Sequence, residues 1–212
     1  PEISYLCGLL EPTSLLACVK PANGGTPPRW HLFVRPANAA EELWDGARAG
    51  VDGAQSFFLA EGAAHALDDA PKVLASELHG GQLHTLFYSA AANPEIDSRL
   101  RSTLLAADAG RMDQQPAHRP VQKLRVVKSA AEQQLMRRSG QVGTGAMNAT
   151  MCGSIGAAAG GLTEGVLAAH FEFESKLAGA ERLAYPCVVA SGNHATTLHY
   201  MHNNAVMRPG EM

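Results

Sequence analysis

The sequence predicts a two-domain protein of the α/β (α+β) class, and three observations lead to this fold class. Strand-like and helix-like patterns alternate over the first 120 residues, which is typical of an α/β domain. The remainder follows the order helix, helix, strand, strand. Between these parts, residues 108–122 are rich in Asp, Gly, Gln and Pro and hold few large apolar side chains, so a domain boundary is expected there. The predicted domains are therefore 1–120 and 121–212.

The composition provides enough apolar residues for a core and excludes several classes of protein. Of the 212 residues, 46% are hydrophobic and 17% are charged, a balance that excludes a disordered chain. The net charge of −3 lacks the basic excess of a nucleic-acid-binding protein, so no nucleic-acid partner is expected. No apolar run approaches the ~18 residues that a membrane-spanning helix needs, so no membrane partner is expected either.

The two predicted domains differ in charge. Residues 1–120 contain 9 Lys and Arg and 14 Asp and Glu, whereas residues 121–212 contain 8 and 6. The last Asp is Asp113, so the final 99 residues contain none. Hard divalent cations prefer clustered carboxylate oxygens, and this distribution therefore limits the metal chemistry of the second domain.

The first domain opens with a predicted hairpin. The apolar runs 15–19 and 30–34 flank a loop rich in Pro and Gly, which is the pattern of two strands with a long connection. The other elements expected here are helices over 39–44, 69–78 and 93–107, a further apolar run over 55–60, and a strand over 83–88.

A capping box predicts the first helix of the second domain. The hydroxyl of Ser129 can accept from the backbone N–H of Glu132, while the Glu132 carboxylate accepts from the backbone N–H of Ser129. Apolar residues at helical spacing continue this helix to about Met151. Three glycines either weaken it or allow close packing against a sheet: Gly140, Gly143 and Gly145.

A connection over 153–161 leads to a second helix in this domain. Thr163 is the expected N-cap and Gly179 the expected stop signal. Two strands, 184–190 and 196–201, are predicted to follow as an antiparallel pair.

Three histidines near the end of the chain form the best ligand-like cluster. A closed zinc site normally has four ligands, and alternation along a strand would place His199 and His202 on opposite faces. We therefore do not expect His194, His199 and His202 to form a zinc site. The preferred interpretation is that one of them has a functional or structural role and the other two lie at the surface. Ser191 and His194 could form a hydrolase pair, but no Asp follows to orient the base.

A longer pattern covers most of the chain. Near the end it contains Tyr185-Pro186-Cys187-Val188-Val189-Ala190-Ser191-Gly192-Asn193, then Thr197-Leu198-His199-Tyr200 and Asn203. Upstream are Arg125, Lys128-Ser129 and Glu132, then Phe171-Glu172-Phe173-Glu174, and in the first domain Tyr5-Leu6-Cys7-Gly8, Glu11-Pro12 and Glu42-Leu43-Trp44-Asp45-Gly46. Together these residues resemble the aminopeptidase P (Xaa-Pro aminopeptidase) branch of the M24 metallopeptidases, most closely its mitochondrial type.

The resemblance implies a creatinase/aminopeptidase P-like N-terminal domain followed by the first, incomplete half of a pita-bread domain. It implies removal of an N-terminal residue that precedes proline, with a metal-activated hydroxide as nucleophile and two Mn²⁺ ions per full-length subunit. Implied partners are a peptide with proline at its second position and further copies of the chain in a homo-oligomer. The implied location is mitochondrial or cytoplasmic.

The resemblance also assigns roles to individual residues. His199 is the expected catalytic residue, donating to the substrate or to the developing oxyanion, and it also belongs to the substrate-binding set with Tyr185 and Trp44. Trp44 would extend toward the active site of a neighbouring subunit in an oligomer. Arg48, close to Trp44 in sequence, is expected to be a solvated surface charge.

No metal ligand is expected within this chain. The family's ligands, two Asp, one His and two Glu, would lie beyond Met212, so the chain is expected to be a fragment that is inactive as given. The alternative hypothesis is a non-catalytic homologue, or a truncated product, that serves as a binding or assembly module.

Overall fold

The computed structural model describes residues 2–20, 25–59, 61–78, 85–88, 94–108, 113–157 and 161–211. The chain divides into two compact units, Pro1–Val126 and Val127–Met212. The sequence prediction places the domain boundary slightly earlier, at residue 120.

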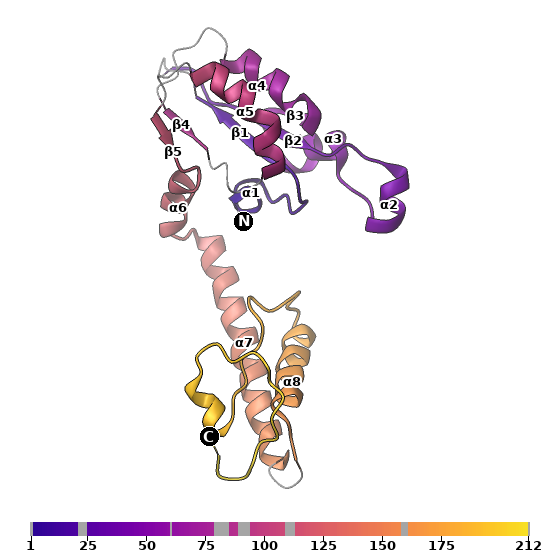
Figure 1. The fold of residues 1–212 in the computed structure, drawn as a ribbon, viewed down its shortest axis with the longest axis vertical. Helices are drawn as coiled ribbons and strands as arrows, with labels where there is room; N and C mark the ends of the chain where they lie inside the picture. Colours follow the sequence, from indigo (N-terminus) through magenta and orange to yellow (C-terminus); the bar gives the residue numbers. More distant parts are fainter. Residues whose placement is uncertain are drawn as a thin grey trace. The chain divides into compact units, whose positions relative to one another are not determined.

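A three-stranded sheet forms the centre of the first unit (Figure 1). Strands β1 (Leu15–Val19) and β2 (Arg29–Val34) pair antiparallel, which confirms the predicted hairpin. Strand β3 (Ala63–Ala66) joins β2 in parallel. The sequence analysis missed β3, because three alanines and a histidine carry no strand signal and only pairing with β2 makes this segment extended.

Strand β2 is buried on both faces, since its alternate side chains enter two different clusters. Phe33 packs with residues of helices α4 (Ala70–Leu78) and α5 (Pro94–Asp108), both of which were predicted. Leu32 and Val34 point to the opposite face, where helix α1 (Glu2–Cys7) contributes Ile3. Burial of a central strand on both sides is the arrangement expected of a layered α/β unit.

The remaining elements of this unit are short helices and a second, two-stranded sheet. The side chain of Asn38 accepts hydrogen bonds from the first turn of α2 (Ala39–Asp45), which was predicted as a helix. Residues 55–58 of the apolar run 55–60 lie in a π-helix, and residue 60 lies outside the described residues. The other elements are α3 (Gly50–Gly53), the π-helix η1 (Ala54–Phe58), the 3₁₀-helix η2 (Leu67–Asp69), β4 (Thr85–Phe87), β5 (Asp113–Gln115) and α6 (His118–Val126).

The expected boundary segment, 108–122, contains regular structure in its described part, although its composition predicts a linker. Residues 113–115 form β5 and residues 118–122 begin α6, while 109–112 lie outside the described residues. Strand β5 pairs in parallel with β4, which lies within the predicted strand 83–88. Pairing with a strand distant in sequence is a tertiary interaction, so local composition could not reveal it.

The second unit begins with the predicted capping box. The backbone N–H of Ser129 donates to Glu132 Oε2 over 2.8 Å, and that of Glu132 donates to Ser129 Oγ over 3.2 Å. Helix α7 (Ala130–Ala157) follows and extends past Met151, so the expected connection over 153–161 is partly helical. Of the helices in the described ranges, none is both long enough and apolar enough to span a bilayer.

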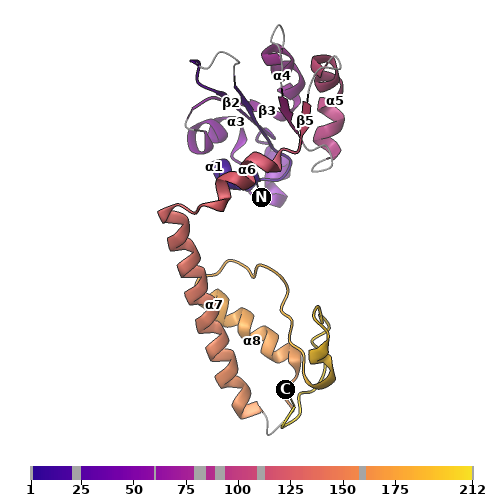
Figure 2. The same ribbon diagram turned by 90° about the vertical axis from the view of Figure 1, so that its left-hand side faces the viewer.

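Helix α8 (Glu164–Leu177) begins and ends as predicted. Thr163 Oγ1 accepts from the backbone N–H of Val166 over 3.3 Å. Gly179 follows the helix with a φ of +96°, a conformation that glycine adopts at little cost. Figures 1 and 2 both show α8 alongside α7. At this contact Gly153 lets the His170 ring lie close to the α7 backbone, because a Cβ there would lie 2.9 Å from Cε1 of His170.

The two strands expected after α8 are absent from the structure. Residues 184–190 are irregular, and 196–201 contain the end of the 3₁₀-helix η4 (Gly192–Thr196) and a turn. A strand needs a neighbouring strand for its backbone groups, and in the described part of this unit the only β-type pair is the bridge between Thr163 and Val206. The prediction of an antiparallel pair here is therefore wrong for this chain.

Candidate functional site

The candidate site is built around Glu164, the first residue of α8. Its side chain is fully buried, with 0% of the residue exposed. The position is favourable for a carboxylate because the N-terminus of a helix carries partial positive charge. A segment near the end of the chain lies against this point, since the backbone N–H of Glu164 donates to the carbonyl of Ala205 over 3.0 Å.

Donors from four positions of the returning chain converge on this carboxylate. Oε1 accepts from the backbone N–H and the hydroxyl of Ser191, both at 2.8 Å. Oε2 accepts from the hydroxyl of Tyr200 at 2.9 Å and from the backbone N–H of Ala205 at 3.0 Å. The Nδ1 atom of His194 lies 3.3 Å from Oε1. The carboxylate therefore joins both ends of the segment 191–205.

These contacts set the ionisation of the cluster. Burial by itself would raise the pKa of Glu164, but the hydrogen bonds from Ala205, Ser191 and Tyr200 outweigh it and lower the pKa to about 2. Burial raises the pKa of Tyr200, and its hydrogen bond to the Glu164 carboxylate raises that pKa further. At neutral pH the Glu164 carboxylate is therefore ionised, and the Tyr200 phenol is protonated and donates a hydrogen bond to it.

A second polar contact holds the segment next to this cluster. The side chain of Asn203 accepts from the backbone N–H of Val189 over 2.9 Å and donates to the carbonyl of Cys187 over 2.8 Å. Asn203 adopts a φ of +46°, which asparagine tolerates better than most residues. Residues 187–189 thus bond to a side chain across the loop, where a strand would bond to another backbone.

The structure places the predicted site residues at the surface. His199 is exposed, in the turn over 198–199, and makes no hydrogen bond with the described residues. Tyr185 is 75% exposed, and Trp44, in the first unit on α2, is 85% exposed. The roles of these three side chains in catalysis and substrate binding remain predictions.

Arg48 was expected to be a solvated surface charge, and that expectation is wrong. Only 7% of its side chain is exposed, and the guanidinium group pairs with the carboxylates of Glu41 and Asp45. Arg48 is thus held over the acidic face of α2, because two carboxylates compensate for its loss of hydration.

Ser191 and His194 do not form a nucleophile–base pair. The hydroxyl of Ser191 donates to Glu164 and not to the His194 ring, which also faces Glu164. A hydrolase pair requires the base to accept from the nucleophile. The third expected histidine, His202, packs edge-on against Tyr200 with ring centroids 5.8 Å apart. The rings of His194 and His202 both pack against Tyr200, and in the described residues the three histidines belong to no group of side chains that could hold a metal ion.

The described residues do not fit a divalent metal centre. Of the carboxylates in the second unit, Glu132 caps α7 and Glu164 is saturated by donors. Glu172 pairs with Lys176 at 2.8 Å, and Glu174 lies 3.5 Å from His170. Within the described ranges, no three His, Cys, Asp or Glu side chains are grouped so that they could hold a metal ion.

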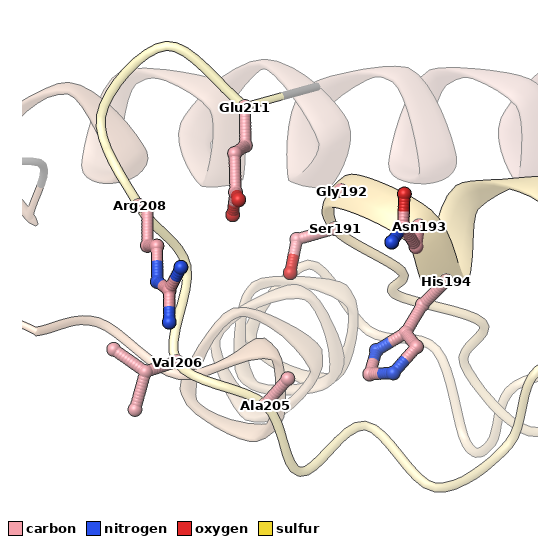
Figure 3. A pocket seen from close by; sticks show the side chains of 8 residues that line it. All are labelled: Ser191, Gly192, Asn193, His194, Ala205, Val206, Arg208 and Glu211. Carbon is pink, nitrogen blue, oxygen red and sulfur yellow. The ribbon is translucent and has the colours of Figure 1, made fainter.

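A pocket of about 400 Å³ lies beside the Glu164 cluster (Figure 3). Ser191 and His194 line one side of this pocket, and Arg208 and Glu211 line the other. Because residue 192 is a glycine, the Glu211 carboxylate can lie close to the backbone there. A Cβ at this position would lie 3.3 Å from that carboxylate. His199 and Tyr185 are not among its lining residues.

Glu164 is the residue of this site that sequence reasoning missed. An acidic residue directly after a Thr N-cap is usually explained as a favourable charge in an exposed first turn. Its burial depends on residues 27 to 41 positions later in the chain, which donate four hydrogen bonds to its carboxylate, two from backbone N–H groups and two from hydroxyls. No local pattern carries that information.

Comparisons with known proteins identify relatives of both units. Residues 1–87 match the model of the aminopeptidase P N-terminal domain, and residues 134–212 match that of metallopeptidase family M24. The chain is 33% identical to Xaa-Pro aminopeptidase 3 of Mus musculus over 98% of this chain and 40% of that protein. It is 27% identical to the mitochondrial intermediate cleaving peptidase 55 of Arabidopsis thaliana over 85% of this chain and 35% of that protein.

Solved structures agree with these assignments. The aminopeptidase PepP of Pseudomonas aeruginosa superimposes with a TM-score of 0.78 at 30% identity, covering 99% of this chain and 47% of that one. The chain thus spans less than half the length of these relatives. The fold-class prediction is confirmed: an aminopeptidase P N-terminal domain precedes part of an M24 domain. From both family models and this structural likeness, the chain belongs to the aminopeptidase P family of the M24 metallopeptidases.

Proposed function

We propose that the protein containing this chain is a metal-dependent aminopeptidase that removes an N-terminal residue preceding proline. Mn²⁺ is the proposed metal, with two ions per full-length subunit supplying the activated hydroxide. The proposed substrate is a peptide with proline at its second position. The proposed location is the mitochondrion, supported by the mitochondrial relative from Arabidopsis thaliana.

The observation that carries this proposal is the agreement over the whole chain with a relative of that named activity. Identity of 33% extends over 98% of the chain and therefore includes both units. A chain with only an assembly role would need to preserve only the surface used for assembly. This similarity is not confined to one surface, because it covers both the N-terminal domain and the M24 segment.

The exposed aromatic and imidazole groups are suited to contact a peptide. His199 is proposed to donate to the substrate carbonyl, where an imidazole N–H can stabilise negative charge as it develops. Tyr185 is proposed to line the substrate pocket. Trp44, 85% exposed on α2, is proposed to contribute to the neighbouring subunit's site in a homo-oligomer, and its exposure leaves the indole free for such a contact.

The second candidate function is a non-catalytic binding or assembly module. One observation favours it: the carboxylates of the described residues of the second unit are not arranged to hold a metal. The proposed enzyme requires ligands that other residues of a longer protein supply.

The test uses the protein expressed from its complete gene. Its hydrolysis of an Xaa-Pro-Xaa peptide is compared with that of the same peptide carrying Ala at the second position. The expected result is release of the first residue from the proline peptide, loss of turnover after chelation, and recovery with Mn²⁺ in preference to Zn²⁺ or Mg²⁺. Binding of peptide without turnover under any of these metals would instead support the non-catalytic module.

A further inference from the structure

We propose that Glu164 is a positioning residue, whose buried carboxylate holds the segment 191–205 in the conformation that presents His199. The inference rests on the proposed function, since it assigns a purpose to the placement of His199. It concerns a residue that does not itself reach a peptide, because its side chain is fully buried.

The first argument is the way in which the two carboxylate oxygens divide their donors. Oε1 accepts hydrogen bonds from the backbone N–H and the hydroxyl of Ser191, at the start of the segment. Oε2 accepts from the backbone N–H of Ala205, at the end of the segment, and from the hydroxyl of Tyr200 within it. One rigid, planar group therefore sets the distance between the two ends of the loop and also fixes an internal point.

The second argument is that the internal point adjoins His199. Tyr200 is 7% exposed, whereas Leu198, on the other side of His199, is 90% exposed. The Tyr200 hydroxyl also contacts Asn204 Oδ1 at 3.2 Å, and its ring stacks on that of His194 with centroids 4.5 Å apart. His199 thus follows an exposed residue and precedes an anchored one. The anchored backbone of Tyr200 therefore fixes the position from which the His199 side chain extends.

The third argument concerns the chemistry of the acceptor. All the groups that converge on Glu164 from Ser191, Tyr200 and Ala205 are N–H or O–H donors. A carboxylate can accept from all of them, because it presents only lone pairs. An amide in the same place would turn one of its ends into an NH₂ donor, facing either the N–H of Ser191 or that of Ala205. Such a buried donor would lose its partner, and the loop would shift to recover one.

The experiment measures kcat and KM for an Xaa-Pro peptide with the complete protein and four variants: Glu164→Gln, His199→Ala, the double variant of these two, and Glu172→Gln. Glu172→Gln is the matched control, since it removes the same charge from the same helix but from a solvent-facing pair with Lys176. We expect Glu164→Gln to lower kcat by about 10- to 100-fold, the range for a misplaced group, with little change in KM. Glu172→Gln should match the wild type.

The double variant separates positioning from a general structural role. If Glu164 acts through His199, Glu164→Gln should change kcat by less than about twofold once His199 is already Ala, because coupled residues are not additive. An equal loss of kcat in both backgrounds would overturn the proposal. Should Glu164→Gln fail to fold, Tyr200→Phe removes one donor and keeps the ring. This variant should lower kcat less, and again only when His199 is present.

Amide hydrogen exchange distinguishes failure of this inference from failure of the proposed function. If the wild-type protein cleaves no Xaa-Pro peptide under any metal condition, the proposed function fails. In the complete protein, faster exchange over 191–205 in Glu164→Gln than in Glu172→Gln would still support the anchoring role. Unchanged exchange over this segment would show that the carboxylate does not hold it.

Discussion

The hydroxyl of Tyr200 donates to Oε2 of Glu164 over 2.9 Å, and both residues are buried. The bond joins the first residue of α8 to a residue 36 positions later. It also connects the buried interior of the second unit to its exposed turn, because His199 directly precedes Tyr200. The predictions for this unit depend largely on that connection.

Acid should destabilise the second unit through Glu164. Hydrogen bonds lower its folded pKa to about 2 from an ordinary value of 4.5. A lowered folded pKa stabilises the fold fully above the ordinary value, and this contribution is lost as the pH falls through the folded pKa. We therefore expect the free energy of unfolding to decrease between about pH 4.5 and pH 2. Urea unfolding at several pH values measures this, and a Glu164→Gln variant with the same slope would contradict it.

His199→Ala in the complete protein should lower kcat/KM by about 10- to 1000-fold, the range for losing one positioned donor to a developing oxyanion. The metal content should remain that of the wild type, because His199 is proposed as a donor and not as a ligand. Kinetics and elemental analysis of the same preparation check both statements. Loss of metal together with activity would show that His199 is a ligand.

Ser129→Ala should destabilise the second unit by about 0.5–2 kcal/mol, the usual effect of removing an N-cap side chain. Ser129 Oγ accepts the backbone N–H of Glu132, and no other group of that side chain can replace it. Thermal and urea unfolding of the 212-residue chain give the value. The matched control is Thr144→Ala on the same helix, whose hydroxyl only bonds back to the carbonyl of Gly140 and is exposed. Equal effects of both changes would count against the capping box.

Two glycines of α7 should respond to alanine in opposite directions. Gly145→Ala should stabilise the chain by about 0.5–1 kcal/mol, because alanine has the higher helix propensity and nothing lies within 4 Å of the added Cβ. Gly153→Ala should destabilise it, because the added Cβ would lie 2.9 Å from the His170 ring. Melting temperatures of both variants test the pair. A stabilising Gly153→Ala would show that His170 moves away at little cost.

The 212-residue chain should bind Mn²⁺ weakly and show no turnover. Hard cations require converging carboxylate oxygens, and those of Glu132, Glu164, Glu172 and Glu174 are divided among a cap, a saturated cluster and side-chain pairs. Calorimetric titration with Mn²⁺ and hydrolysis of an Xaa-Pro peptide are the measurements. Stoichiometric binding at micromolar metal would mean that a centre exists within this chain.

The sequence by itself determined most of the helices. Ser129 with Glu132, and Thr163 with the residues after it, predict helix starts that the structure confirms. These signals are reliable because a cap bonds to backbone groups only two or three residues away, so its energy depends on local sequence. The hairpin of β1 and β2 was predictable for a similar reason, since two apolar runs flank a loop composed of turn residues.

Only the tertiary structure decided which extended segments become strands and which polar residues are buried. Residues 184–190 carry a strand-like pattern but remain irregular, whereas β3 has no such pattern and pairs with β2. Glu164 looks like an exposed first-turn residue, yet donors from Ser191 to Ala205 enclose it. The reason is the same in each case. The backbone groups of a strand and the atoms of a buried charge need hydrogen-bond partners, and here those partners are distant in sequence. Which residues become those partners is decided only when the chain folds.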